Sequence, residues 1–338
     1  MEKVHDYCII LAGGIGKRLW PCSRKQLPKQ FIDFFGTGRT LLQQTFDRVA
    51  RVVPTENIFV STYTDYLPLV REQLPDVSPD RIMPEPVQLS TAPTVAWAAS
   101  HIVRLDAAAC IFVTPCDQVI LHEERYAEEL QQGLDYVRHH DVFLAMGVPA
   151  TRANSAYGYL QLGDELEAGL YSVRSFTEKP DEQYAQFFVD SGEFVWNTGL
   201  ILANAATISK VAPAVNLENY SASTRRSIDL AILEGRDDVC VHVCRFGWAD
   251  IGSWPELHNV GEKDADGNVV LGKNKTLLTG SSNNLVSVPD KMAVILRGLD
   301  GYLVAANDRV LLICPNNDPG LVKKIYKEAS IELGEQYT

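Results

Sequence analysis

The chain has 338 residues and a mass of 37.5 kDa, enough for about two domains and a sizeable core. Hydrophobic residues make up 46% and charged residues 22%, which excludes a disordered or collagen-like chain. The formal net charge of −12 argues against nucleic-acid or membrane partners, so any anionic ligand needs a local basic patch.

The amino-terminal residues and the cysteines indicate a cytoplasmic protein. The apolar run at 7–12 is too short for a signal sequence or a membrane span. Seven cysteines are scattered without a C-x-x-C pair, as expected in a reducing compartment. Cys240 and Cys244 flank His242, but no second ligand pair follows at zinc spacing, so we interpret them as buried strand residues.

The first half of the chain alternates strand and helix patterns. Short apolar runs predict strands at 7–12, 58–62, 81–83 and 109–114, and helix-spaced apolar residues predict helices at 41–53, 94–105 and 123–138. This succession predicts an α/β fold with a Rossmann-like, mainly parallel sheet flanked by helices. Ligands of such sheets bind beyond the carboxyl ends of the strands, so we expect functional loops after residues 12 and 114.

The second half is richer in strands. Further strands are predicted at 142–146, 157–162, 171–177, 194–202 and 239–246, so the sheet becomes mixed. After about residue 264, turn residues punctuate short Val and Leu runs, which predicts a small β domain, with a left-handed β-helix as one candidate. An amphipathic helix is expected at 319–334. We therefore predict domains at 1–262 and 263–338.

A basic, glycine-rich loop follows the first predicted strand. Between Gly13 and Gln30 the chain carries five basic residues, three glycines and no acid. Glycine amides can close on phosphate oxygens while Lys and Arg neutralise their charge. The loop is neither a Walker A motif, because Arg18 follows Lys17, nor a dinucleotide fingerprint, because Leu19 replaces the third glycine. It predicts a polyphosphate site, with a solvated basic loop as the alternative.

The loop resembles the signature of sugar-phosphate nucleotidyltransferases. Residues 11–24 carry L-A-G-G-x-G-x-R-L-W-P-x-S-R, and 28–31 carry P-K-Q-F, which with Trp20 is similar to the mannose-1-phosphate guanylyltransferase branch. The resemblance implies catalytic contacts to phosphate by Arg18 and Lys29. It also implies nucleotide contacts by Leu11, Ala12, Gly13, Gly14, Gly16 and Lys17.

Two aspartates resemble the family's magnesium ligands. Asp117 lies in T-P-C-D-Q, similar to the family's P-A-D-H segment, and Asp250 lies in W-A-D-I-G-S-W, similar to W-x-D-V-G-S-W. A carboxylate at a sheet's carboxyl edge suits a hard cation that bridges phosphates. The resemblance implies Mg²⁺ on both acids, with Pro115 at the nucleotide. The alternatives are a helix N-cap for Asp117 and an Asp-x-Gly turn for Asp250.

Further motifs are similar to the family's sugar-binding and base-binding elements. They are Y-G-Y-L at 157–160, F-T-E-K-P at 176–180, W-N-T-G at 196–199, S-I-D-L-A-I-L-E at 227–234 and E-P-V-Q-L-S-T-A-P-T at 85–94. The implied sugar-phosphate contacts are Gly158, Glu178, Lys179, Asn197 and Asp229, and the implied base contacts are Glu85, Ser90 and Thr91. Carboxylates and amides suit hydroxyl groups, and an ammonium suits a phosphate. The alternatives are a surface charge pair at 178–179 and a helix N-terminus at 90–91.

The family resemblance implies that GMP is transferred from GTP to α-D-mannose 1-phosphate, giving GDP-mannose and pyrophosphate. No histidine falls in a motif, and a phosphate monoester, with a second pKa of about 6, needs no general base. Glu85 could accept from guanine N–H groups and reject adenine. Another sugar or base, a dinucleotide dehydrogenase and a non-catalytic sugar-nucleotide sensor are the alternatives. Short family members also imply a homo-oligomer formed through the carboxy-terminal domain.

Overall fold

The computed structural model describes residues 5–338, which form two compact units. The first unit contains Thr45–Cys116, Ile120–Trp248 and the segment that ends at Gly13, and the second contains Gly14–Gln44, Asp117–Val119 and Ala249–Thr338. The basic loop and both aspartates predicted to bind metal therefore belong to the second unit. None of the helices in the described part of the chain is long and apolar enough to span a bilayer.

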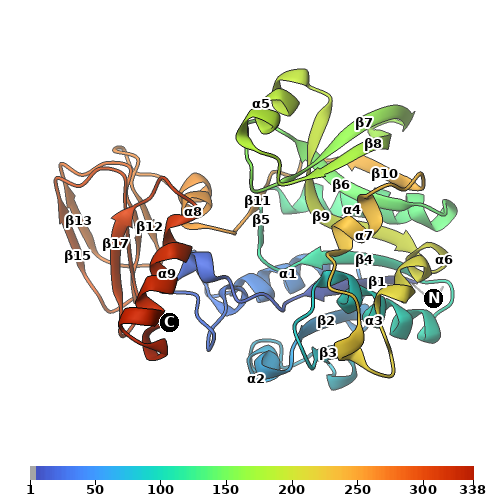
Figure 1. Cartoon of the computed structure of the whole chain (residues 1–338), viewed down its shortest axis with the longest axis horizontal. Coiled ribbons are helices and arrows are strands. Elements are labelled where there is room, and N and C mark those ends of the chain that lie inside the picture. The colour runs from blue at the N-terminus through green and yellow to red at the C-terminus, as the bar shows by residue number, and fades with distance from the viewer. Residues whose placement is uncertain (1–4) are drawn as a thin grey trace. The chain divides into compact units, whose positions relative to one another are not determined.

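A nine-stranded mixed sheet forms the centre of the first unit (Figure 1). In spatial order its strands are β3 (Ile82–Glu85), β2 (Ile58–Tyr63), β1 (Asp6–Leu11), β4 (Cys110–Pro115), β9 (Phe194–Asn204), β6 (Phe143–Pro149), β10 (Val239–Val243), β8 (Leu170–Glu178) and β7 (Gly158–Glu167). From β3 to β4 the neighbours are parallel, whereas β9 is antiparallel to β4 and β6. The predicted mixed α/β sheet is confirmed.

Helices cover both faces of this sheet. They are α2 (Leu67–Gln73), α3 (Thr91–Leu105), α4 (Glu123–His139), α5 (Glu182–Ser191), α6 (Ala205–Ile208) and α7 (Ile228–Leu233). Ile201 of β9 packs in one buried cluster with Ile102 of α3, whereas the next residue, Leu202, lies beside Gly133 of α4. Because successive strand residues point to opposite faces, α3 and α4 cover opposite sides of the sheet.

Several predicted boundaries shift by a few residues. Helix α1 (Leu41–Val49) ends before the predicted residue 53, and residues 50–52 form turns. The strand predicted at 239–246 stops at Val243. Cys240 lies within this strand and is buried, as the strand interpretation expects, whereas Cys244 is buried but lies just after the strand.

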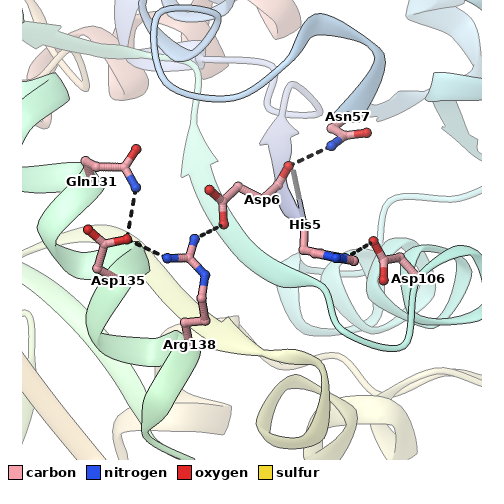
Figure 2. Close-up of polar contacts among 7 residues, drawn as sticks. All are labelled: His5, Asp6, Asn57, Asp106, Gln131, Asp135 and Arg138. Carbon is pink, nitrogen blue, oxygen red and sulfur yellow. Dashed lines mark hydrogen bonds and ion pairs between the residues drawn. The ribbon is translucent and has the colours of Figure 1, made fainter. Parts of the chain in front are cut away.

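A polar network ties α4 to the amino end of β1 (Figure 2). Arg138 donates to the carboxylates of Asp6 and Asp135 at 2.8 and 2.5 Å, and Asn57 donates to the main-chain oxygen of Asp6 at 3.0 Å. The side chain of Asp6 is buried. Arg138 therefore supplies the counter-charge for a carboxylate that is removed from water.

Replacing Arg138 by alanine is expected to lower the free energy of unfolding by about 2 kcal/mol, because it leaves the buried Asp6 carboxylate unpaired. Urea unfolding measures this loss. Arg226→Ala, which removes an exposed pair with Glu234, is the matched control and should change stability by less than about 1 kcal/mol. Equal losses of unfolding free energy in both variants would contradict the expectation that the ion pair of the buried Asp6 contributes more than an exposed pair.

The second unit combines small sheets with two helices. The elements are α8 (Trp254–Val260), β12 (Val269–Leu271), β13 (Thr276–Thr279), β14 (Leu285–Ser287), β15 (Val294–Arg297), β16 (Tyr302–Ala306), β17 (Leu311–Pro315) and α9 (Leu321–Glu332). Strands β12, β14 and β16 are parallel, β17 pairs antiparallel with β16, and β13 pairs in parallel with β15. Leu19 and Trp20 of the basic loop share one buried cluster with Trp254, Leu303 and Val322. The loop is thus part of this unit's core.

Candidate functional site

The carboxyl end of β1 places the start of the glycine-rich loop. Leu11 pairs with Pro115 across β1 and β4, as parallel strands that end together require. The Ala12 amide donates to the main chain of β2 at 2.7 Å, and the Gln88 side chain donates to the Gly13 carbonyl at 2.8 Å. These bonds hold the residues of the loop that lie in the first unit.

Glu85 ends β3 with its carboxylate buried among hydroxyl groups. Tyr220 and Thr94 each donate to its Oε2 at 2.6 Å, and the Ser61 hydroxyl lies 3.4 Å from its Oε1. Burial raises the pKa of Glu85, and the three hydroxyls oppose that rise. Oε1 lies 3.7 Å from where a Cβ on Gly13 would be, so this oxygen lies on the side of Gly13.

Ser90 and Thr91 stand at the start of α3. The helix begins at Thr91, which agrees with the helix N-terminus alternative, although the Ser90 side chain makes no capping hydrogen bond. The Thr91 hydroxyl accepts from the Ile228 amide at 2.8 Å, and the Ala92 amide donates to the Arg226 carbonyl at 3.1 Å. These bonds tie the start of α3 to the start of α7.

The predicted sugar-phosphate residues meet on three neighbouring strands and α7. Gly158 of β7 pairs with Glu178 of β8 and with Asn197 of β9. Asn197 donates from Nδ2 to the Asp229 carboxylate at 2.7 Å. A Cβ on Gly158 would lie 2.8 Å from Oε2 of Glu178, so glycine leaves the room that this carboxylate occupies.

The predicted sugar-phosphate residues also include a shifted pKa and a strained backbone. Burial and the nearby charge of Glu178 raise the pKa of Asp229, while the bond from Asn197 and the charge of Lys179 lower it. Lys179 pairs with Glu178 through its ammonium group. The backbone of Lys179 has a φ of 49°, a left-handed conformation that is costly for residues other than glycine and is often retained at functional sites.

In the second unit, two short strands bring the predicted metal ligands together. Strands β5 (Gln118–Ile120) and β11 (Trp248–Asp250) pair, and the Ile251 amide donates to the Asp117 carbonyl at 2.9 Å. The Lys29 ammonium lies 2.6 Å from the Asp117 carboxylate and donates to the Ile251 carbonyl at 2.8 Å. The helix N-cap alternative for Asp117 is wrong, because a strand follows it.

Asp250 and Arg18 lie beside the same glycine. A Cβ on Gly252 would be 2.7 Å from Oδ2 of Asp250 and 2.9 Å from Nη2 of Arg18, so only glycine fits between them. Burial raises the pKa of Asp250 to about 6; Lys29 and Arg18 oppose this shift, and the negative charge of Asp117 adds to it. We define Arg18, Lys29, Asp117 and Asp250 as the charged cluster.

The glycine-rich loop folds back over the charged cluster. Gly16 has a φ of 72°, and a Cβ on it would lie 2.9 Å from the Lys29 side chain, so both backbone and space require glycine. Gly14 is exposed, and a Cβ on it would have no atom within 4 Å. The Lys17 ammonium lies 5.1 Å from the centroid of the Tyr326 ring on α9, a cation–π contact that the sequence did not indicate.

The donor set of the charged cluster fits a hard divalent cation. The cluster supplies two carboxylates that influence each other electrostatically, and the described residues include no group of three or more His, Cys, Asp or Glu that could hold a metal. The remaining ligands would have to be water and substrate oxygens, which is the usual arrangement for Mg²⁺. Burial is the largest cause of the raised pKa of Asp250, and a bound cation would favour the ionised carboxylate and so lower that pKa.

The chain is similar to several known proteins. The profile of a family described as nucleotidyl transferase matches residues 7–267. The alginate biosynthesis protein AlgA of Pseudomonas aeruginosa is 32% identical, over 95% of this chain and 71% of that protein. A mannose-1-phosphate guanylyltransferase of Salmonella montevideo is 30% identical, over 96% of this chain and 74% of that protein. A crystal structure described as a mannose-1-phosphate geranyltransferase from Thermus thermophilus matches with a TM-score of 0.87 and 29% identity, over 97% of this chain and 100% of that one.

Proposed function

We propose, from the premise that the chain belongs to the nucleotidyl transferase family, that it transfers GMP from GTP to α-D-mannose 1-phosphate. The products are GDP-mannose and pyrophosphate. The observation that carries the proposal is the charged cluster, in which two cations of the glycine-rich loop lie close to two acids. The choice of guanine and mannose is supported by the names of relatives about 30% identical to this chain.

The chain's own residues would position and neutralise two anions. An oxygen of the sugar phosphate attacks the α-phosphorus of GTP in line, so that a new P–O bond forms while the bond to pyrophosphate breaks. Arg18 and Lys29 offset the repulsion between the anions and the charge that develops on the leaving group. No side chain has to remove a proton, because the attacking phosphate is already largely dianionic at neutral pH.

The other predicted residues receive roles that match their chemistry. Asp117 and Asp250 would hold Mg²⁺, which supplies positive charge to the phosphate oxygens when bound. Glu85 would accept from the N–H groups of guanine, and Lys179 would pair with the sugar phosphate. Contacts to the sugar hydroxyls are assigned to Glu178 and Asn197, supported by Asp229.

A substrate matrix tests the proposal. Several sugar 1-phosphates are combined with GTP, ATP, UTP and dTTP in the presence of Mg²⁺, and pyrophosphate release is measured in each mixture. The mixture of mannose 1-phosphate and GTP is expected to give the highest kcat/KM, at least about tenfold above the others. Faster release with another pair would reassign the substrate. No release in any mixture would favour a non-catalytic sensor.

We also propose the domain division and the β-helix that the sequence predicts. Residues 263–338 would form a small domain after the catalytic domain at 1–262. Val269 pairs with Leu285, and Leu285 with Leu303, so successive parallel strands repeat every 16 or 18 residues. This repeat supports a left-handed β-helix. The proposed subunit contacts through residues 263–338 would give a homo-oligomer, which the mass of the protein in solution tests.

A further inference from the structure

The carboxylate of Glu85 is held asymmetrically by its hydroxyl partners. Oε2 accepts from both Tyr220 and Thr94 at 2.6 Å, whereas Oε1 has one long contact, to Ser61 at 3.4 Å. Oε1 is also the oxygen that lies beside Gly13. The structure thus leaves Oε1 able to accept a further hydrogen bond on the side of Gly13.

Of the three hydroxyls around Glu85, that of Tyr220 makes the most specific hydrogen bond to the carboxylate. A hydroxyl has one hydrogen to donate, and the hydroxyls of Thr94 and Ser61 can also donate to main-chain carbonyls, at 3.0 and 3.4 Å. Among the bonds recorded for residues 5–338, the Tyr220 hydroxyl donates to Glu85 alone. The Trp97 ring, 5.4 Å from that of Tyr220 between centroids, supports the phenol from the side.

We propose that Tyr220 is a specificity-determining residue that keeps Glu85 an ionised carboxylate, with Oε1 free to accept from the base. This inference rests on the proposed function. An ionised carboxylate only accepts hydrogen bonds and therefore matches guanine, whose ring N–H and amino group both donate. A neutral carboxylic acid both donates and accepts, and so matches the ring nitrogen and amino group of adenine.

The environment of Glu85 opposes its ionisation. Burial in the first unit raises the pKa of this carboxyl group, and the hydroxyl donors are the groups that oppose the rise. No cationic group is among the influences on this carboxyl group. Loss of the Tyr220 hydroxyl should therefore favour the protonated carboxyl group and weaken the preference for guanine over adenine.

Tyr220→Phe tests the inference, because it removes the hydroxyl and retains the ring beside Trp97. We expect the ratio of kcat/KM for GTP to that for ATP to fall about tenfold, mainly through KM. The acid limb of the pH profile of kcat/KM for GTP should also move to higher pH. Tyr136→Phe on α4, which loses a hydroxyl elsewhere in the same unit, is the matched control and should change neither quantity.

A double-mutant cycle with Glu85→Gln separates specificity from structure. Glutamine is uncharged at every pH and both donates and accepts, so this variant should lose the GTP preference, and Tyr220→Phe should then have no further effect on it. Calorimetric binding of GTP and ATP to each variant reports the same preference without turnover, provided that circular dichroism matches that of the wild type.

The outcomes distinguish this inference from the proposed function. If the wild type shows no guanylyl transfer, the proposed function fails. If the wild type prefers GTP, but Tyr220→Phe leaves both the nucleotide ratio and the acid limb unchanged, Tyr220 only ties its segment to the sheet and the inference is overturned. If Tyr220→Phe does not fold, Glu85→Gln alone decides, because a retained GTP preference in that variant also overturns the inference.

Discussion

Arg18→Ala is expected to lower kcat about 10³-fold, the size typical for a lost arginine or oxyanion donor in phosphoryl or acyl transfer. Arg18 lies beside Gly252 and Asp250 in the charged cluster, and no ion pair is recorded for its guanidinium within residues 5–338. It is therefore free to contact substrate phosphates. Pyrophosphate release under saturating substrates measures the loss.

Folding should change little in the same variant. Because Arg18 is only partly buried, the free energy of unfolding is expected to fall by less than about 0.5 kcal/mol in urea titrations. Arg18→Lys should restore part of kcat, since an ammonium keeps the charge but not the planar fork of donors. Lys323→Ala, an exposed charge loss on α9, is the control. Ordinary turnover by Arg18→Ala would remove this residue from the mechanism.

The features predicted best are those that depend on local sequence and on strand direction. Leu11 and Pro115 end adjacent parallel strands, so the loops after them had to start at one edge of the sheet. The meeting of Gly158, Glu178 and Asn197 follows in the same way from neighbouring strands that carry recognisable motifs. The family motifs, and not spacing along the chain, identified these three residues.

Contacts between remote segments were not predictable. Tyr220 lies 135 residues from Glu85, in a segment without regular hydrophobic periodicity, and a tyrosine there gives no sign of its partner. The Gly252 contact with Arg18 depends on two loops whose backbones meet only in the folded unit. The cation–π contact between Lys17 and Tyr326 likewise requires α9 to pack on the loop. Such pairs depend on tertiary packing, which periodicity does not encode.

The sequence indicated only one of the two roles of the loop at 13–30. Its charge and glycines indicated a phosphate site, yet the same segment also contributes to a hydrophobic core. The Trp20 indole donates to the Tyr337 carbonyl at 3.0 Å, and the Trp254 indole donates to the Trp20 carbonyl at 3.0 Å. The carboxy-terminal residues thus hold the loop in place, a dependence that sequence motifs confined to residues 11–31 do not reveal.

Asp250→Asn is expected to abolish turnover while stabilising the metal-free protein. Burial raises the pKa of the Asp250 carboxyl group from 3.8 to about 6, so the folded state binds its proton more tightly than the unfolded state. Stability therefore decreases as the pH rises from about 4 to about 6. Above that window the ionised carboxylate lowers the free energy of unfolding by about 3 kcal/mol, a cost that asparagine does not carry.

Measurements at two pH values and with Mg²⁺ test this prediction. In urea titrations the variant should gain about 3 kcal/mol at a pH of about 7.5 and almost nothing at a pH of about 4, where the wild-type carboxyl group is already protonated in the folded state. Mg²⁺ should raise the Tm of the wild type but not of the variant, because a ligand stabilises only the protein that binds it. The exposed Asp76→Asn is the control and should leave stability, Mg²⁺ response and kcat unchanged. A variant that is less stable than the wild type at neutral pH would mean that Lys29 and Arg18 already compensate the Asp250 charge, and the cluster would then have no need of a metal ion.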